Sequence, residues 1–257
     1  MKFKQQLVAA LLCGGLSLVS ADPAWAGATQ EVTYASLTPQ TTVTFNELLA
    51  TPFDTVLIDG LLSSGGVQFG ERFAGQELAI AKAPRPGAIA QDWFDDLTFG
   101  SPTAGLTLMA GALGANLGVY HYGDAYGAAL AGIGPQNTDG SDPFGFGAIS
   151  ARFAAPVSGL GLQLRDTDGG AITLALYRED GSLIETLDLS GRADGFYAFS
   201  RVGGAADIAG FTLTNRDSYY GIAIDNLVLA APVPEPATAL LALGGLAVLA
   251  LARRRRA

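Results

Sequence analysis

ITLALYR-EDGS-LIETLDL, residues 172–189, is the stretch that decides the fold. Two short runs rich in apolar and β-branched residues flank a polar turn, and this pattern predicts a β-hairpin. Gly181 suits the turn because glycine has no Cβ and tolerates a positive φ. The alternation of apolar and polar residues in the second run is imperfect. Glu185 falls on the side of the leucines, and Ile184 falls on the polar side. The hairpin still indicates an antiparallel β protein.

Short runs of the same kind recur along the chain, separated by Gly, Asp, Asn and Pro. About thirteen such strands predict an all-β fold, an antiparallel β-sandwich, because each sheet must bury one face against another. A jelly-roll-like sandwich is the preferred version, and a more open immunoglobulin-like sandwich is the alternative. The less regular stretches Pro84–Gly105 and Gly111–Gly147 are predicted to form long loops over one rim. The predicted strands are Thr41–Phe45, Thr55–Asp59, Val67–Phe69, Glu77–Ala81, Thr107–Ala110, Gly118–Tyr122, Ala148–Phe153, Gly159–Arg165, Ala171–Arg178, Leu183–Leu189, Phe196–Ser200, Phe211–Asn215 and Gly221–Leu229.

The N-terminus has the three parts of a secretory signal peptide. A basic head precedes an apolar run over residues 7–19, and Ala24-Trp25-Ala26 supplies the exit, so signal peptidase is expected to cleave before Gly27. A buried N-terminal helix is the alternative. Bulky Leu12 stands before Cys13, where a lipoprotein needs a small residue. Residues 1–26 are thus the signal peptide, 27–230 the β-sandwich domain and 231–257 a separate tail.

Removal of the signal peptide leaves an acidic chain without cysteine. Residues 27–236 hold nine basic and 23 acidic residues, a net charge of −14. Such a surface repels phosphate, which excludes nucleic acid as a partner. The chain has one histidine, His121, and no G-x-S-x-G motif, so a nucleophilic or zinc-dependent enzyme is not indicated. A secreted glycan-active enzyme that uses a pair of carboxylates is the alternative to a non-enzyme.

One acidic residue, Asp225, lies between apolar residues that should face the core. A carboxylate turned inward needs hydrogen-bond donors or a cation. VTFNE (43–47), GGVQFG (65–70) and SYYGIAIDNLVL (218–229) resemble the opening and closing strands of jelly-roll domains in extracellular carbohydrate-binding and cell-surface proteins. The resemblance implies a structural Ca²⁺ ion held by Glu47 and Asp225. Ordinary Asp-Gly turns are preferred over calcium loops at 137–142 and 165–170.

Aromatic residues in the irregular stretches are candidates for stacking on sugar rings. Packing in the core or in a hairpin is the preferred explanation for each of them. The candidate ligand contacts are Trp93, Tyr120, Tyr122 and Tyr126.

The tail VPEPATALLALGGLAVLALARRRRA (233–257) has three blocks. Residues 237–252 are almost wholly apolar, and as a helix of 16 residues they would extend about 24 Å, against a bilayer core of ~30 Å. The four terminal arginines would stay in the cytoplasm. A single transmembrane helix with the domain outside, retained as a permanent anchor, therefore fits the physics.

The order Val-Pro-Glu-Pro, apolar span and arginine block strongly resembles the PEP-CTERM sorting signal of Gram-negative bacteria. The resemblance implies that an exosortase recognises the tail and cleaves it after transient anchoring in the inner membrane. The protein would then reach the cell surface or the exterior, in a setting linked to exopolysaccharide and biofilm. The expected role is structural or adhesive, with contact to extracellular polysaccharide. The matching residues are Pro234, Glu235, Pro236, Arg253, Arg254, Arg255 and Arg256.

Overall fold

The computed structural model describes residues 29–49, 51–84, 91–134, 144–217 and 221–231. Side chains are described throughout these ranges except at 81–84 and 91–99. The predicted signal peptide and the tail from residue 232 onward lie outside the described residues. Within the described ranges no helix is long and apolar enough to cross a membrane.

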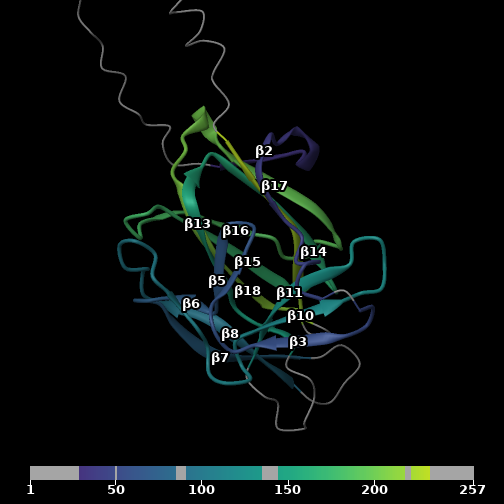
Figure 1. The fold of residues 1–257 in the computed structure, drawn as a ribbon. Coiled ribbons are helices and arrows are strands. Elements are labelled where there is room, and N and C mark those ends of the chain that lie inside the picture. The colour runs from purple at the N-terminus through teal and green to yellow at the C-terminus, as the bar shows by residue number, and fades with distance from the viewer. Residues whose placement is uncertain (1–28, 50, 85–90, 135–143, 218–220, 232–257) are drawn as a thin grey trace, which may run out of the picture.

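Two antiparallel sheets form the body of the structure (Figure 1). The larger, nine-stranded sheet has the order β1 (Thr29–Val32), β17 (Gly195–Arg201), β14 (Gly159–Arg165), β19 (Ala223–Ala230), β11 (Ala128–Ile133), β10 (Leu117–His121) and β3 (Thr55–Ile58), with β12 (Phe144–Gly147) beside β11 and β2 (Pro39–Val43) beside β19. The six-stranded sheet has the order β16 (Leu183–Asp188), β15 (Ala171–Tyr177), β18 (Ile208–Arg216), β13 (Ile149–Val157), β5 (Val67–Gly70) and β4 (Leu62–Ser64).

Small elements complete the described part of the chain. Two further strand pairs are separate from the main sheets, and two short 3₁₀ helices lie between strands. These elements are β6 (Arg72–Phe73) with β9 (Leu108–Met109), β7 (Glu77–Pro84) with β8 (Gln91–Phe99), η1 (Tyr34–Ser36) and η2 (Val202–Gly204).

The strand order is that of a jelly roll. From β13 to β19 the chain changes sheet at every connection except the β15–β16 hairpin. The larger sheet accordingly contains the order β11-β19-β14-β17, and the facing sheet contains β13-β18-β15-β16. This double-sheet arrangement of interleaved antiparallel strands confirms the predicted fold class.

One hydrophobic core fills the space between the two sheets. Leu160, Leu162 and Leu164 of β14 extend into it from the larger sheet, and Leu174 and Leu176 of β15 extend into it from the smaller. Every one of these side chains is fully buried. The alternation of core-facing leucines with other residues holds this register, because a slip by one residue would turn the leucines away from the core.

The predicted hairpin is β15–β16, with Asp180 and Gly181 in its turn. A register shift between Leu176 and Tyr177 explains the imperfect alternation of the second strand. Such a bulge changes the phase of the side chains, and Ile184 packs against the core as Leu187 does. Glu185 accepts hydrogen bonds from the backbone N–H and the hydroxyl of Thr29, at 2.7 and 2.6 Å.

The prediction of long loops over Gly111–Gly147 was wrong for two segments. Residues 128–133 (AALAGI) form β11 and residues 144–147 (FGFG) form β12. Every residue of β11 is buried, because the sandwich core covers one face of the strand and a second cluster with Tyr122 and Phe144 covers the other. At Gly132 only glycine fits, because a Cβ there would lie 2.3 Å from the carbonyl oxygen of Gly147.

The other loop prediction, Pro84–Gly105, was wrong for residues 91–99, which form β8 and pair with β7. The strands β1, β4 and β6 were also missed. Each of these three has four residues or fewer, so each is too short to show a clear alternation of apolar and polar residues.

Two turn glycines test how the hairpin contributes to stability. Gly181 and Gly191 both have positive φ, +85° and +74°. A Cβ at Gly181 would lie 2.1 Å from the carbonyl oxygen of Pro102, whereas a Cβ at Gly191 would meet nothing within 4 Å. Gly191→Ala should therefore lower the free energy of unfolding by about 1 kcal/mol through backbone strain alone. Gly181→Ala should lower it by about 2–4 kcal/mol, because the neighbouring backbone must also move. Urea denaturation measures both, and equal losses would contradict the packing role of this turn.

Candidate functional site

The candidate site lies at one end of the larger sheet, around the last residue of β14, Arg165. Its guanidinium is buried, with an exposed fraction of 6% for the residue. Nη2 donates to Oδ2 of Asp124 at 2.6 Å. The guanidinium carbon lies 4.1 Å from the ring centre of Tyr122 and 5.5 Å from that of Tyr126. A cation between two rings is stabilised by their electron-rich faces. We call Tyr120, Tyr122, Asp124, Tyr126 and Arg165 the tyrosine–arginine cluster.

The cluster contains three of the four predicted aromatic contacts. Tyr120 and Tyr122 are half-buried and meet edge to face at 4.9 Å between ring centres. Tyr126 is 45% exposed and packs edge to face on Phe196 of β17 at 5.7 Å. The fourth residue, Trp93, lies in β8, and its side chain is outside the described part of the structure.

The hydroxyl of Tyr122 donates to Oδ2 of Asp166. Burial, the negative charge of Asp166 and this hydrogen bond raise the pKa of Tyr122 well above its usual range. The tyrosine is therefore a neutral hydrogen-bond donor. Burial also raises the pKa of Asp166, although the hydrogen bond from Tyr122 opposes that effect.

Asp225 in β19 is fully buried, as the sequence pattern predicts. Its Oδ1 accepts from the backbone N–H of Asn226 at 2.6 Å, and its Oδ2 accepts from Nδ2 of Asn226 at 2.9 Å. Asn226 has a φ of +46° at a register shift between β14 and β19, and its Nδ2 also donates to Oε1 of Gln163 at 2.8 Å. The bulge thus turns an amide side chain toward the buried carboxylate.

The charge of Asp225 is strongly disfavoured. Burial raises the pKa of its carboxyl to about 7, and the negative charges of Asp124 and Glu47 add to the effect. The N–H of Asn226 and the charge of Arg165 act in the opposite direction. Glu47 is exposed in the turn after β2 and accepts a hydrogen bond from the hydroxyl of Ser64. The fold therefore brings the two predicted calcium ligands close enough for Glu47 to influence the titration of Asp225.

A buried acid just after β18, Asp217, contacts the loop at 165–170. Its Oδ2 accepts from the backbone N–H groups of Asp168 and Gly170 at 2.9 and 3.0 Å. These contacts are those of a carboxylate that fixes a turn. The second turn, 137–142, lies outside the described residues. Among the side chains that the structure describes, no group of three or more His, Cys, Asp or Glu residues could hold a metal ion.

Arg165 and Asp124 were not singled out from the sequence. An arginine at the end of the apolar strand GLGLQLR is the signal for a buried cation that needs an anionic partner. The partner itself is not predictable, because Asp124 is 41 residues away and the fold alone brings it close.

The two interleaved antiparallel sheets define an all-β protein with a jelly-roll sandwich. Residues 232–256 match the PEP-CTERM protein-sorting motif. The chain therefore carries this signal, which implies an exported protein with a transient membrane anchor that an exosortase processes. A search of curated proteins found no match to the chain. The motif covers the tail alone and says nothing about the activity of the jelly roll.

The buried Asp225 predicts a specific pH dependence of stability. The unfolded carboxyl has a pKa near 4 and the folded carboxyl one of about 7. The folded state therefore keeps a proton that the unfolded state has lost, and stability falls as the pH rises through this window. The loss should be on the order of 4 kcal/mol between about pH 4 and pH 8. Asp225→Asn should remove this part of the slope in urea denaturation from pH 5 to 8.5.

The matched control is Asp188→Asn, which removes a fully exposed carboxyl whose pKa is lowered by hydrogen bonds from Ser190. Its curve should run parallel to that of the native sequence over the same pH range. Parallel curves for Asp225→Asn as well would show that Asp225 ionises without cost.

Proposed function

We propose that this protein is a structural or adhesive component of the bacterial cell surface or extracellular matrix, linked to exopolysaccharide or biofilm. The observation that carries the proposal is the PEP-CTERM signal behind a β-sandwich whose end holds the tyrosine–arginine cluster. Export places the domain where polysaccharide is found, and the cluster supplies rings and a carboxylate suited to sugars.

The cluster has the chemistry of a glycan contact. Tyr126 is nearly half exposed, and the side chain of Asp124 is 43% exposed. An aromatic face stacks on the apolar side of a sugar ring, and a carboxylate accepts from sugar hydroxyls. Arg165 holds Asp124 in place by the 2.6 Å contact, so the carboxylate is oriented before a ligand arrives. The rigid part of the site is therefore ready to bind without ordering a loop.

A non-catalytic role is proposed because the carboxylate of the cluster, Asp124, and that of Asp166 beside it are already engaged. Asp124 accepts from Arg165 and from the backbone N–H groups of Tyr126 and Gly127, and Asp166 accepts from Tyr122. A glycoside hydrolase needs one carboxyl that donates a proton and a second that attacks or activates water. A glycan-active enzyme remains the alternative, and the appearance of shortened products during the binding experiment would establish it.

A glycan array probed with the exported protein tests the binding role. Tyr126→Ala, Tyr120→Ala and Trp93→Ala should each weaken binding about 2- to 10-fold, since each removes one ring. Tyr197→Ala is the matched control, because Tyr197 packs on Arg192 outside the cluster. No binding to any sugar would leave a purely structural role.

The sorting proposal predicts a defined end for the exported protein. Cleavage at the Pro-Glu-Pro block would remove the apolar span and the arginines, so the intact mass should lack all residues after about Pro236. Mass spectrometry of protein from the surface or medium of a host with an exosortase makes the measurement. A mass that still includes the four arginines would favour a permanent anchor.

We further propose that Glu47 and Asp225 hold a structural Ca²⁺ ion. Calcium prefers carboxylate and amide oxygens, and a divalent cation would offset the burial that raises the pKa of Asp225. The urea denaturation series at different pH values is then repeated with added calcium and with a chelator. Calcium should flatten the slope, and a chelator should restore it and lower the melting temperature. No change with chelator would assign both acids to hydrogen bonds alone.

A further inference from the structure

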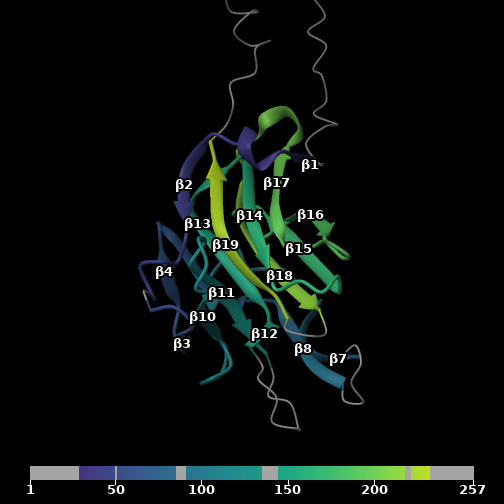
Figure 2. The same cartoon turned by 90° about the vertical axis from the view of Figure 1, so that its right-hand side faces the viewer.

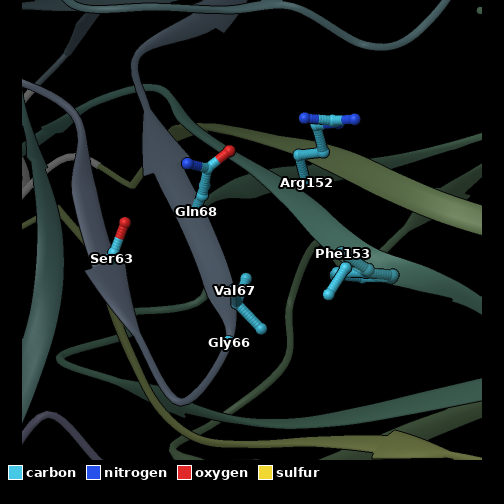
Figure 3. A pocket seen from close by; sticks show the side chains of 7 residues that line it. Ser63, Gly66, Val67, Gln68, Arg152 and Phe153 are labelled. Carbon is cyan, nitrogen blue, oxygen red and sulfur yellow. The ribbon is translucent and has the colours of Figure 1, made fainter.

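The outer face of the six-stranded sheet carries a polar groove over β4, β5 and β13. The groove has a volume of about 380 Å³. Ser63 lies opposite Gln68 in the β4–β5 register, and Gln68 lies opposite Arg152 in the β5–β13 register. Figure 3 shows these three side chains on the same side of the sheet, while Val67 and Phe153 point to the other side, where the core lies. Three adjacent strands place the row across about 10 Å.

Arg152 stands out because it has no partner. Among the arginines of the described residues, each of the others has at least one hydrogen bond, ion pair or ring contact. Arg152 has none, although the chain is strongly acidic and Arg152 is half-buried in β13. A guanidinium without an anionic partner, on a half-buried residue whose stem lies on the sheet, is suited to receive a carboxylate from a ligand.

The groove has defined walls. Gly210 of β18 lies opposite Arg152, and a Cβ there would lie 3.0 Å from Leu106 and 3.1 Å from Phe73. These two side chains belong to a second small core that covers part of this face. Glu179, which lines the adjoining hollow with Arg152, is the nearby acid and forms no ion pair with it within 4.0 Å. This core therefore bounds the groove on the side of β18.

We propose that this groove binds a carboxylate-bearing sugar, a hexuronate unit of an acidic polysaccharide. The guanidinium of Arg152 matches a carboxylate with two parallel hydrogen bonds. The amide of Gln68 and the hydroxyl of Ser63 both donate and accept, as sugar hydroxyls require. The groove offers no aromatic face, because Phe153 points into the core. Recognition therefore depends on charge and hydroxyl groups, which favours an acidic sugar over a neutral one.

This inference rests on the proposed contact with extracellular polysaccharide but uses a different surface. The tyrosine–arginine cluster belongs to the larger sheet, whereas the groove belongs to the outer face of the smaller one. A negatively charged polymer is repelled by most of a surface with a net charge of −14 over residues 27–236. An unpaired arginine is then the point at which such a polymer can approach closely.

The test uses a tetramer of galacturonate and its methyl-esterified counterpart, titrated calorimetrically into the exported protein. The acidic tetramer should bind and the ester should bind at least tenfold more weakly. Arg152→Ala should lower the affinity for the acidic tetramer at least tenfold, and Arg152→Lys should restore only part of it, because lysine lacks the paired donors. Glu179→Gln should leave the affinity unchanged or raise it, since it removes a neighbouring negative charge.

Two further variants keep the result interpretable. Ala154→Phe fills the groove from an exposed position of β13 without altering Arg152, and it should abolish binding. Arg192→Ala removes a charge of the same kind from the exposed pair with Glu31 and should have no effect. Melting temperatures confirm that each variant is folded.

The outcomes separate this inference from the proposed function. If the acidic tetramer still binds to both the Arg152→Ala and the Ala154→Phe variants, the proposal that the groove is its binding site is overturned. Binding of neutral glycans through the tyrosines, without any binding of the acidic tetramer, would overturn it as well and leave the proposed function intact. Failure of every glycan in both experiments would overturn both the groove as a binding site and the glycan contact of the tyrosine–arginine cluster, and would leave a purely structural role.

Discussion

The larger sheet depends on its last strand. β19 pairs with β14 along most of its length, with β11 through Ala223 and Ile224, and with β2 from Leu227 to Ala230 (Figure 2). One strand thus joins the early and late parts of the chain in the middle of the sheet. The change from one partner to the other occurs around Asn226, which takes a left-handed φ at a bulge. A buried carboxylate beside that bulge is tolerated because the same asparagine donates two hydrogen bonds to it.

Close packing explains a composition that looks unfavourable for strands. β11 is buried on both faces, so its alternating positions must both be small or apolar, and alanine and glycine fill them. The cost in intrinsic strand propensity is offset by burial and by the close approach of β12. The charged groups follow a related rule. A buried guanidinium such as Arg165 has an anion and two rings beside it, whereas the half-buried Arg152 has none and faces an open groove.

Local signals in the sequence predicted much of the fold. The Asp180-Gly181 turn and the strand 159–165 were found because turn chemistry and alternation were both clear. The strand 128–133 was missed because burial on both faces removes the alternation of apolar and polar residues, and no β-branched residue precedes Ile133 within the strand. For the candidate site, the inward position of Asp225 was predictable from its apolar neighbours. The pairing of Arg165 with Asp124 was not, because it joins residues that only the completed fold brings together.

The position of β19 near the end of the chain has a consequence for synthesis and sorting. A single residue, Ala231, separates the end of this strand from the sorting motif that starts at residue 232. Synthesis therefore reaches the central strand of the sheet after every other strand of the domain, so the larger sheet cannot be complete before residue 230 has been made. The last strand of the sheet and the sorting signal are therefore adjacent in the chain. A truncated chain that ended before residue 223 would lack both the central strand of the larger sheet and the sorting signal. Such a product could neither complete its sheet nor be recognised for sorting.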